Sequence, residues 1–279
     1  MSWKIVADSS CELRSLDGLC PGLTFDTVPL KIRVGEREFV DNAALDTALM
    51  MQAMHNYNGP TSSACPSPEE WAEKFLQADN VVAITMTSGL SGTYNSAVVA
   101  RDMVLENHPG KNIYVLDTLS IGGQMVLDIW KARELIAQGL PFEQVCARLE
   151  AYNQSVQLLF ALANFDNLVK NGRMNRLVGF VAGRMNMRAV GRASEAGKLE
   201  MLHKTRGETR MLALMLEEMD HRGYDGSRPA VISHCYNAEG ARLLANGIRN
   251  KWPGAQVVVL PTSGLTSYYA EEQGMIIGY

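Results

Sequence analysis

The sequence has few cysteines, and they form no recognisable motif. Five cysteines, an odd number, are spread over 279 residues without a Cys-x-x-Cys spacing. The five histidines likewise show no spacing typical of metal ligands. This pattern argues against a disulfide framework and against a zinc site. We therefore expect reduced thiols, as in a cytoplasmic protein, and neither a metal nor a cofactor.

Long apolar runs and an excess of positive charge are also missing. No run approaches the about 20 residues that span a bilayer, and the opening residues MSWKIVADSS lack the apolar core of a signal peptide. Lys and Arg number 26 against 30 Asp and Glu, which gives a formal net charge of −4. A chain of this charge has no basic footprint for nucleic acid. These absences predict a cytoplasmic globular protein that does not bind nucleic acid.

Common catalytic motifs are absent as well. The sequence contains no GxSxG nucleophile elbow, no P-loop and no GxGxxG fingerprint. A phosphoryl-transfer enzyme needs carboxylates that hold Mg²⁺, and Asp8 and Asp117 are the only obvious candidates. We therefore expect that this chain alone is not an enzyme.

Alternating strand and helix patterns are present, and they are organised around residues 81–98. Residues 81–84 are an apolar, partly β-branched run typical of a buried strand. A loop rich in hydroxyls and glycines follows, and after it a helical pattern begins near Tyr94. Free N–H groups at a helix start suit a phosphate or a carboxylate. The alternative is that the loop hydroxyls only cap the helix.

Polar residues follow three predicted strands in the same way. They lie at residues 8–10, 87–88 and 117–118, each followed by a loop or a helix. Strand and helix alternation predicts a parallel sheet, and ligands bind at the carboxyl edge of such a sheet. We expect the polar stretch 61–67 to be a loop. Together with the polar residues at the three strand tips, it would surround one crevice. The alternative for each single tip is a helix cap.

The second half of the chain changes character near residue 155. We predict strands at 156–162, 230–233, 256–260 and 275–279, and a hairpin over 191–202. His234 follows the strand at 230–233, where it either contacts the crevice or has only a structural role. Arg173 and Arg206 are placed to bind a carboxylate or phosphate, or simply to be solvated. We expect two α/β domains, residues 1–155 and residues 156–279.

Several segments together resemble the DegV family. The similarity is carried by residues 5–10 (IVADSS), 63–71 (SACPSPEEW), 87–96 (TSGLSGTYNS), 115–118 (VLDT) with Gly122-Gly123, and 168–174 (LVKNGRM). The loop at 87–96 is the most specific of these matches. They occur in the family's order and extend over nearly the whole chain.

The resemblance implies a two-domain DegV-like α/β fold that holds a long-chain fatty acid between its domains. It also implies that the chain presents the fatty acid carboxylate to a separate kinase subunit for acyl-phosphate formation. A transient contact with a membrane surface is compatible with that role. The bound fatty acid is then a ligand, and no cofactor is implied.

The polar strand ends and the resemblance together indicate which residues contact the ligand. The residues expected to bind the carboxylate are Thr61, Ser62, Ser63, Ser88, Gly89, Ser91, Gly92, Thr93 and Tyr269. Those expected at the ligand mouth or at the partner surface are Asp8, Ser9, Asp117, Thr118, Arg173, Arg206 and His234.

Two positions depart from the family pattern. Asn171 stands where the family has a glycine, and Tyr269 is the counterpart of a histidine that faces the carboxylate in many relatives. A phenol donates one hydrogen bond but carries no positive charge near neutral pH. Two further classes remain open: an enzyme acting on a small phosphorylated or carboxylated metabolite, and a sensor of such a metabolite.

Overall fold

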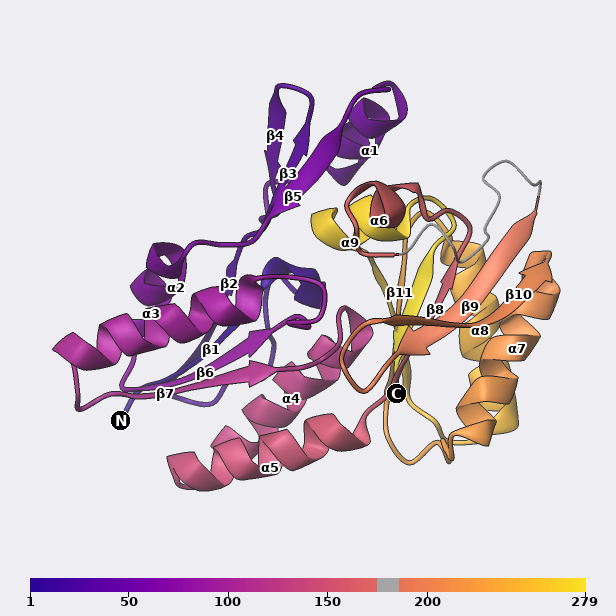
Figure 1. Ribbon diagram of the computed structural model, residues 1–279. Helices are drawn as coiled ribbons and strands as arrows, with labels where there is room; N and C mark the ends of the chain where they lie inside the picture. Colours follow the sequence, from indigo (N-terminus) through magenta and orange to yellow (C-terminus); the bar gives the residue numbers. More distant parts are fainter. Residues whose placement is uncertain (175–185) are drawn as a thin grey trace.

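The structure is a computed structural model that describes residues 1–174 and 186–279. Its first sheet is parallel, with strand order β2-β1-β6-β7 (Figure 1). The strands are β1 (Trp3–Asp8), β2 (Leu23–Val28), β6 (Asn80–Thr85) and β7 (Asn112–Asp117). Because the strands are parallel, the polar residues after β1, β6 and β7 lie along one edge, which confirms the predicted parallel sheet.

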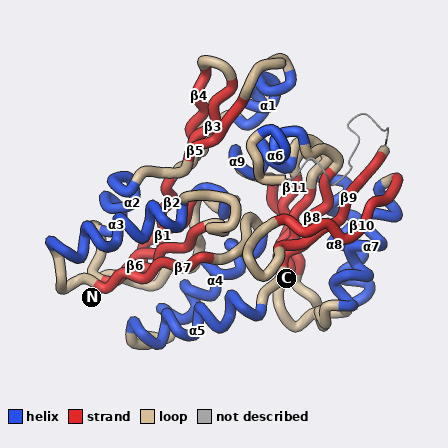
Figure 2. The backbone as a smooth tube through the Cα atoms, in the orientation of Figure 1, coloured by secondary structure: helices blue, strands red, loops and turns tan. Residues whose placement is uncertain are grey.

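Helices cover both faces of this sheet (Figure 2). On one face lie α2 (Pro68–Phe75) and α3 (Thr93–Asn107), and on the other α4 (Gly123–Ala137) and α5 (Phe142–Ser155). A capping box starts α2, because Ser67 and Glu70 each accept a backbone N–H of the other. A short turn of 3₁₀ helix, η1 (Ser9–Cys11), follows β1.

A small antiparallel sheet projects from the first one (Figure 1). It has the order β4-β3-β5 and is built from β3 (Lys31–Val34), β4 (Arg37–Val40) and β5 (Thr61–Ala64), with α1 (Thr47–His55) beside it. β3 and β4 form an antiparallel hairpin that turns at Gly35. The loop predicted over the polar stretch from residue 61 is wrong at its start. Residues 61–64 pair with β3 through the backbone, so they form a strand without an apolar face.

The second sheet is mixed and has the order β10-β9-β8-β13-β11-β12. Its strands are β8 (Leu158–Leu162), β9 (Met187–Ala193), β10 (Leu199–Arg206), β11 (Ala230–His234), β12 (Val257–Pro261) and β13 (Met275–Gly278). β11 and β12 run parallel and the other neighbours antiparallel. The final strand of the sequence is thus in the middle of this sheet.

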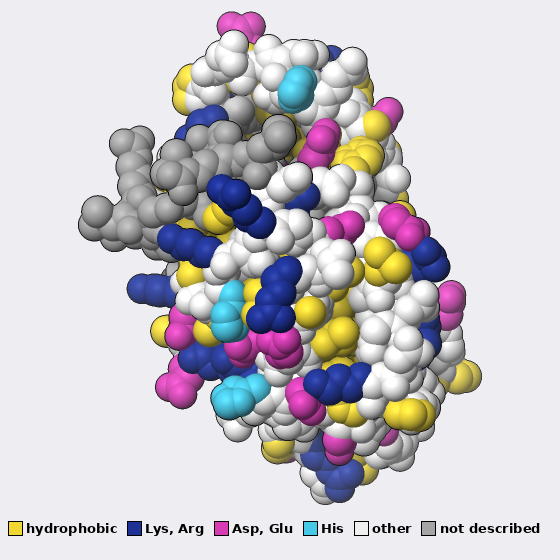
Figure 3. Space-filling model, turned by 90° about the vertical axis from the view of Figure 1, so that its right-hand side faces the viewer, with side chains coloured by type: hydrophobic (Ala, Val, Ile, Leu, Met, Phe, Trp, Pro, Cys, Tyr) yellow, Lys and Arg dark blue, Asp and Glu magenta, His cyan; other side chains and the backbone are white. Residues whose placement is uncertain are grey.

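Helices of the second half lie on both sides of this sheet. α7 (Glu208–His221) and α8 (Ala238–Lys251) pack on one face around a core that includes Met215 and Leu244. The short helices α6 (Asp166–Lys170) and α9 (Gly264–Ala270) lie on the side of the small sheet (Figure 1). On the surface over α7 and α8, Lys and Arg are interspersed with Asp and Glu (Figure 3).

Helix α4 joins the two large sheets. One side packs on β1 and β6 of the first sheet, and the other contacts β11 and β13 of the second. Its first residue, Gly123, lies so close to the second sheet that an added Cβ would be 2.2 Å from the carbonyl oxygen of Val231. A side chain larger than hydrogen does not fit there. Within the described part of the chain, no helix is long and apolar enough to cross a membrane.

Candidate functional site

A cavity of about 280 Å³ lies where the three sheets approach one another. This is close to the lower end of the about 300–1,000 Å³ that is usual for small-molecule pockets. Its walls are mainly apolar, formed by Leu30, Met86, Leu90, Ile121, Phe160, Leu162, Leu168, Leu199, Leu265, Ala270 and Ile276. An apolar cavity of this kind suits a hydrocarbon chain.

Polar side chains on the cavity wall include Ser63, Arg173 and Tyr269, which contact one another, and Ser91, which follows the residue that Arg173 binds. The hydroxyls of Ser63 and Tyr269 are 2.8 Å apart, and the Arg173 guanidinium lies 5.9 Å from the centre of the Tyr269 ring. Arg173 Nε donates to the carbonyl oxygen of Leu90 at 3.3 Å, next to Ser91. We call Ser63, Ser91, Arg173 and Tyr269 the polar end of the cavity. Hydroxyl donors and one guanidinium there suit a carboxylate.

The loop that carries Ser91 is held by two aspartates at strand tips. Asp8 Oδ2 accepts the N–H of Met86 at 2.6 Å, and Asp117 Oδ1 accepts the N–H of Ser88 at 3.0 Å. Asp8 is fully buried, and this burial raises its pKa to about 6. Both carboxylates therefore fix the backbone of the loop and do not line the cavity. At the loop's end, Ser91 Oγ lies 2.8 Å from Thr93 Oγ1 in the first turn of α3.

Strand β5 and helix α9 face each other across the polar end. Thr61 and Ser63 lie on the same face of β5, because side chains alternate along a strand. Thr61 Oγ1 is 2.7 Å from the hydroxyl of Tyr268, just as Ser63 pairs with Tyr269. Two adjacent tyrosines of α9 thus bond two alternate hydroxyls of β5, which fixes the position of α9 relative to the small sheet.

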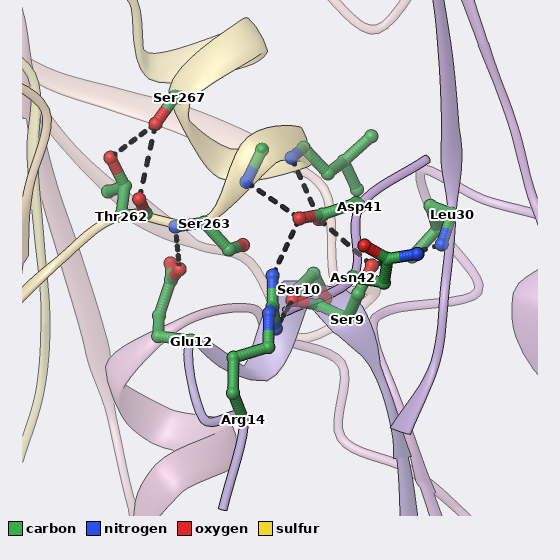
Figure 4. Close-up of polar contacts among 12 residues, drawn as sticks. Ser9, Ser10, Glu12, Arg14, Leu30, Asp41, Asn42, Thr262, Ser263 and Ser267 are labelled. Carbon is green, nitrogen blue, oxygen red and sulfur yellow. Dashed lines mark hydrogen bonds and ion pairs between the residues drawn. The ribbon is translucent and has the colours of Figure 1, made fainter. Parts of the chain in front are cut away.

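The start of α9 is anchored by carboxylates from the N-terminal segment (Figure 4). Asp41 accepts the N–H groups of Gly264 and Leu265, at 2.8 and 2.9 Å, and pairs with Arg14 at 2.6 Å. Glu12 accepts the N–H of Ser263. An added Cβ on Gly264 would lie 2.8 Å from Asp41 Oδ1, so glycine permits this close approach. Since Leu265 lines the cavity, this anchor sets one of its walls.

The structure brings only some of the expected site residues to the cavity. Ser63, Ser91, Gly92, Arg173 and Tyr269 line it. Thr93 is one hydrogen bond away from it, through Ser91. Thr61 does not line it and instead bonds the hydroxyl of Tyr268, the neighbour of Tyr269.

The remaining expected residues do not line the cavity. Ser62, Ser88 and Arg206 are exposed, and Gly89 packs against the turn at 196–197. Ser9 bonds Asp41, and Thr118 bonds the carbonyl oxygen of Thr85. His234 is half-buried, its Nδ1 accepts the N–H of Asn237, and burial lowers its pKa.

Sequence reasoning missed three residues that organise the site: Asp41, Asn171 and Tyr268. No local pattern identifies Asp41, whereas Asn171 and Tyr268 lie in segments that depart from the family pattern. In the described part of the chain, no group of three or more His, Cys, Asp or Glu is placed to hold a metal ion.

Comparisons with known proteins agree with this architecture. A family model described as "Uncharacterised protein, DegV family" matches residues 2–278. A DegV domain-containing protein of Streptococcus gordonii is 44% identical over 279 residues, which cover 100% of this chain and 99% of the relative.

Two solved structures are similar over the whole chain. The Streptococcus pneumoniae Fatty Acid Kinase (Fak) B3 protein loaded with linoleic acid is 44% identical with a TM-score of 0.97, covering 100% of this chain and 99% of that one. A DegV family protein from Eubacterium eligens loaded with heptadecanoic acid is 34% identical with a TM-score of 0.95, covering 99% of each chain.

Proposed function

This chain belongs to the DegV family, and we propose that it binds a long-chain fatty acid in the cavity, with the carboxylate at the polar end. The observation that carries the proposal is a cavity with mainly apolar walls on which Ser63, Tyr269 and Arg173 contact one another, with Arg173 also bonded to the carbonyl next to Ser91. Burial of each CH₂ contributes about 0.8 kcal/mol, so an alkyl chain binds tightly with few polar contacts. The two relatives loaded with linoleic and heptadecanoic acid support the same ligand class.

We further propose that residues 1–155 and residues 156–279 act as two domains that enclose the ligand between them. Cavity residues come from both parts, for example Met86 and Ser91 from the first and Phe160 and Ile276 from the second. Binding of the acyl chain would then depend on how closely the two parts approach.

Mass spectrometry of extracted lipid tests the proposed ligand. The purified protein is denatured, extracted with organic solvent and analysed for fatty acids. We expect a long-chain fatty acid in about equimolar amount, because a buried alkyl chain dissociates slowly. A protein that carries no fatty acid and fails to take up added oleate or palmitate would refute the proposal and reopen the sensor and enzyme alternatives.

The proposed role of the bound acid is presentation to a separate kinase subunit in the cytoplasm, with acids exchanged during transient contacts with a membrane surface. The kinase name of the Streptococcus pneumoniae relative supports this role. Arg173 suits the partner side, because it is half-buried at the polar end and keeps part of its surface open.

Two arginine variants test the presentation role. We expect Arg173→Ala to lose acyl-phosphate formation when a kinase subunit and Mg-ATP are added, even at fatty acid concentrations that saturate the variant. Arg206→Ala is the control, because Arg206 is exposed at the end of β10 and does not line the cavity. This chain alone should not turn over ATP. Turnover without the kinase subunit would favour an enzyme instead.

A further inference from the structure

The hydroxyl of Tyr268 joins three segments beside the polar end. Tyr268 is fully buried on α9. Its Oη lies 2.7 Å from Thr61 Oγ1 on β5 and 2.8 Å from Asn171 Nδ2, just after α6. These three residues are distant in sequence, and they form one chain of hydrogen bonds.

The direction of this chain is determined by Asn171. Its Nδ2 also donates to the backbone carbonyl of Asn167 at 2.9 Å, and a carbonyl oxygen can only accept. The amide nitrogen therefore faces Tyr268 as a donor too. Tyr268 accepts from Asn171 and has one proton, which it gives to Thr61. Burial raises the pKa of Tyr268, so the phenol keeps that proton at neutral pH.

Thr61 is left with its own proton to donate. The acceptor that the structure offers is Asn167 Oδ1 at 3.5 Å, which is a long and weak hydrogen bond. Thr61 lies two residues before Ser63 on the same face of β5, and Ser63 lines the cavity. The Thr61 hydroxyl thus lies beside the polar end, and its proton has only a weak acceptor within the protein.

Asn171 also contacts the cation of the polar end. Its backbone carbonyl accepts from Arg173 Nη1 at 2.7 Å. One residue therefore bonds the guanidinium through its main chain and the Tyr268–Thr61 pair through its side chain.

We propose, on the basis of the proposed fatty acid binding, that Asn171 and Tyr268 are positioning residues that hold the Thr61 hydroxyl, beside the polar end, as a donor to the head group. Such a site selects an ionised carboxylate, which accepts through both oxygens, over a neutral head group on the same chain. A neutral head group leaves donors unpaired, and an unpaired buried donor costs affinity.

The test compares oleic acid with oleyl alcohol as probes. Dissociation constants for both are measured by titration on the full chain, on Tyr268→Phe, on Asn171→Leu and on the double variant. We expect each single variant to weaken oleic acid binding about tenfold, the lower end for a hydrogen bond to a charged group, and to leave oleyl alcohol binding unchanged. The double variant should have about the same affinity for oleic acid as either single variant, since both substitutions break the same chain of hydrogen bonds.

The control variant is Tyr224→Phe, because Tyr224 is also a buried tyrosine but bonds the carbonyl of Arg228, outside the cavity lining. It should bind both probes like the original protein. Equal weakening of acid and alcohol, or additive effects in the double variant, would overturn the proposal. Failure of the original protein to bind either probe would instead overturn the proposed function itself. Asn171 is only half-buried, so Asn171→Leu is the better tolerated substitution. It still tests the proposal if Tyr268→Phe does not fold.

Discussion

Two serines of one loop have different surroundings, although the sequence makes them look equivalent. Ser91 lines the cavity and its hydroxyl pairs with Thr93, whereas Ser88 is exposed and contributes its backbone N–H to Asp117. At the scale of the single residue, the side chain's direction therefore decides which hydroxyl reaches a ligand.

This difference gives a matched pair of substitutions. Ser91→Ala should weaken fatty acid binding by about ten- to a hundredfold, the usual effect of losing a hydrogen bond to a charged group. Ser88→Ala, in the same loop and with the same chemistry, should bind like the original protein. Titration with a fluorescent fatty acid measures both. Equal affinities for the two variants would show that the carboxylate lies elsewhere in the cavity.

The sequence predicted roles for the hydroxyl loop, Ser63 and Arg173, because these residues occur in recognisable local motifs, and Ser63, Ser91 and Arg173 line the cavity. It could not tell that Asp8 and Asp117 bond the loop backbone, since a carboxylate at a strand tip serves a ligand or an N–H group equally well. It also could not pair Asn171 with Tyr268, which are 97 positions apart. Such pairing depends on how α6 and α9 pack and on no local pattern.

At the scale of the element, helix α9 depends on groups outside itself. Its first N–H groups have no partner within the helix, and Glu12 and Asp41 supply oxygens for them. Asp41 is completely buried and accepts four hydrogen bonds, from Gly264, Leu265, Ser9 and Arg14. A helix of seven residues does not hold its position without such anchors.

Asp41→Asn should therefore lower the free energy of unfolding by about 3–5 kcal/mol, the usual cost of breaking a buried ion pair. An amide keeps one accepting oxygen and turns an NH₂ group toward the remaining donors. Urea denaturation followed by circular dichroism measures the change.

Asp46→Asn is the control for this substitution. Asp46 is exposed and caps α1 by accepting the N–H of Leu49, and asparagine caps helices equally well. Its stability should stay near that of the original protein. If both variants were equally stable, Asp41 would not be an anchor of α9.

Sequence patterns found the long elements better than the short polar ones. β6 is an apolar run, and α2 has a capping box, so both are visible locally. β5 (TSSA) has no apolar face, and its strand geometry comes from pairing with β3. Its recognition therefore required knowledge of a distant partner.

At the scale of the whole molecule, buried acids give stability a dependence on pH. Burial raises the pKa of Glu12 from 4.5 to about 7. The unfolded chain releases this proton near pH 4.5 while the folded chain keeps it, so this group's contribution to stability falls as the pH rises from about 4.5 to 7. The loss is at most about 3 kcal/mol. Asp8, with a pKa raised to about 6, acts in the same direction.

Glu12→Gln removes this titration and keeps an oxygen for the N–H of Ser263. The variant should match the original protein near pH 4 and become progressively more stable than it up to about pH 7. Urea unfolding at a series of pH values gives the difference in free energy. A difference that does not change with pH would mean that Glu12 titrates normally in the folded protein.

The central place of β13 has a consequence for how the protein is made. β8, β9 and β10 lie on one side of this strand and β11 and β12 on the other, so the two halves of the second sheet cannot join until residues 275–278 have left the ribosome. The cavity wall formed by α9 and Ile276 of β13 is completed at that moment. The first sheet, by contrast, can fold during translation. The newborn protein therefore acquires its capacity to hold a ligand only once β13 has emerged from the ribosome.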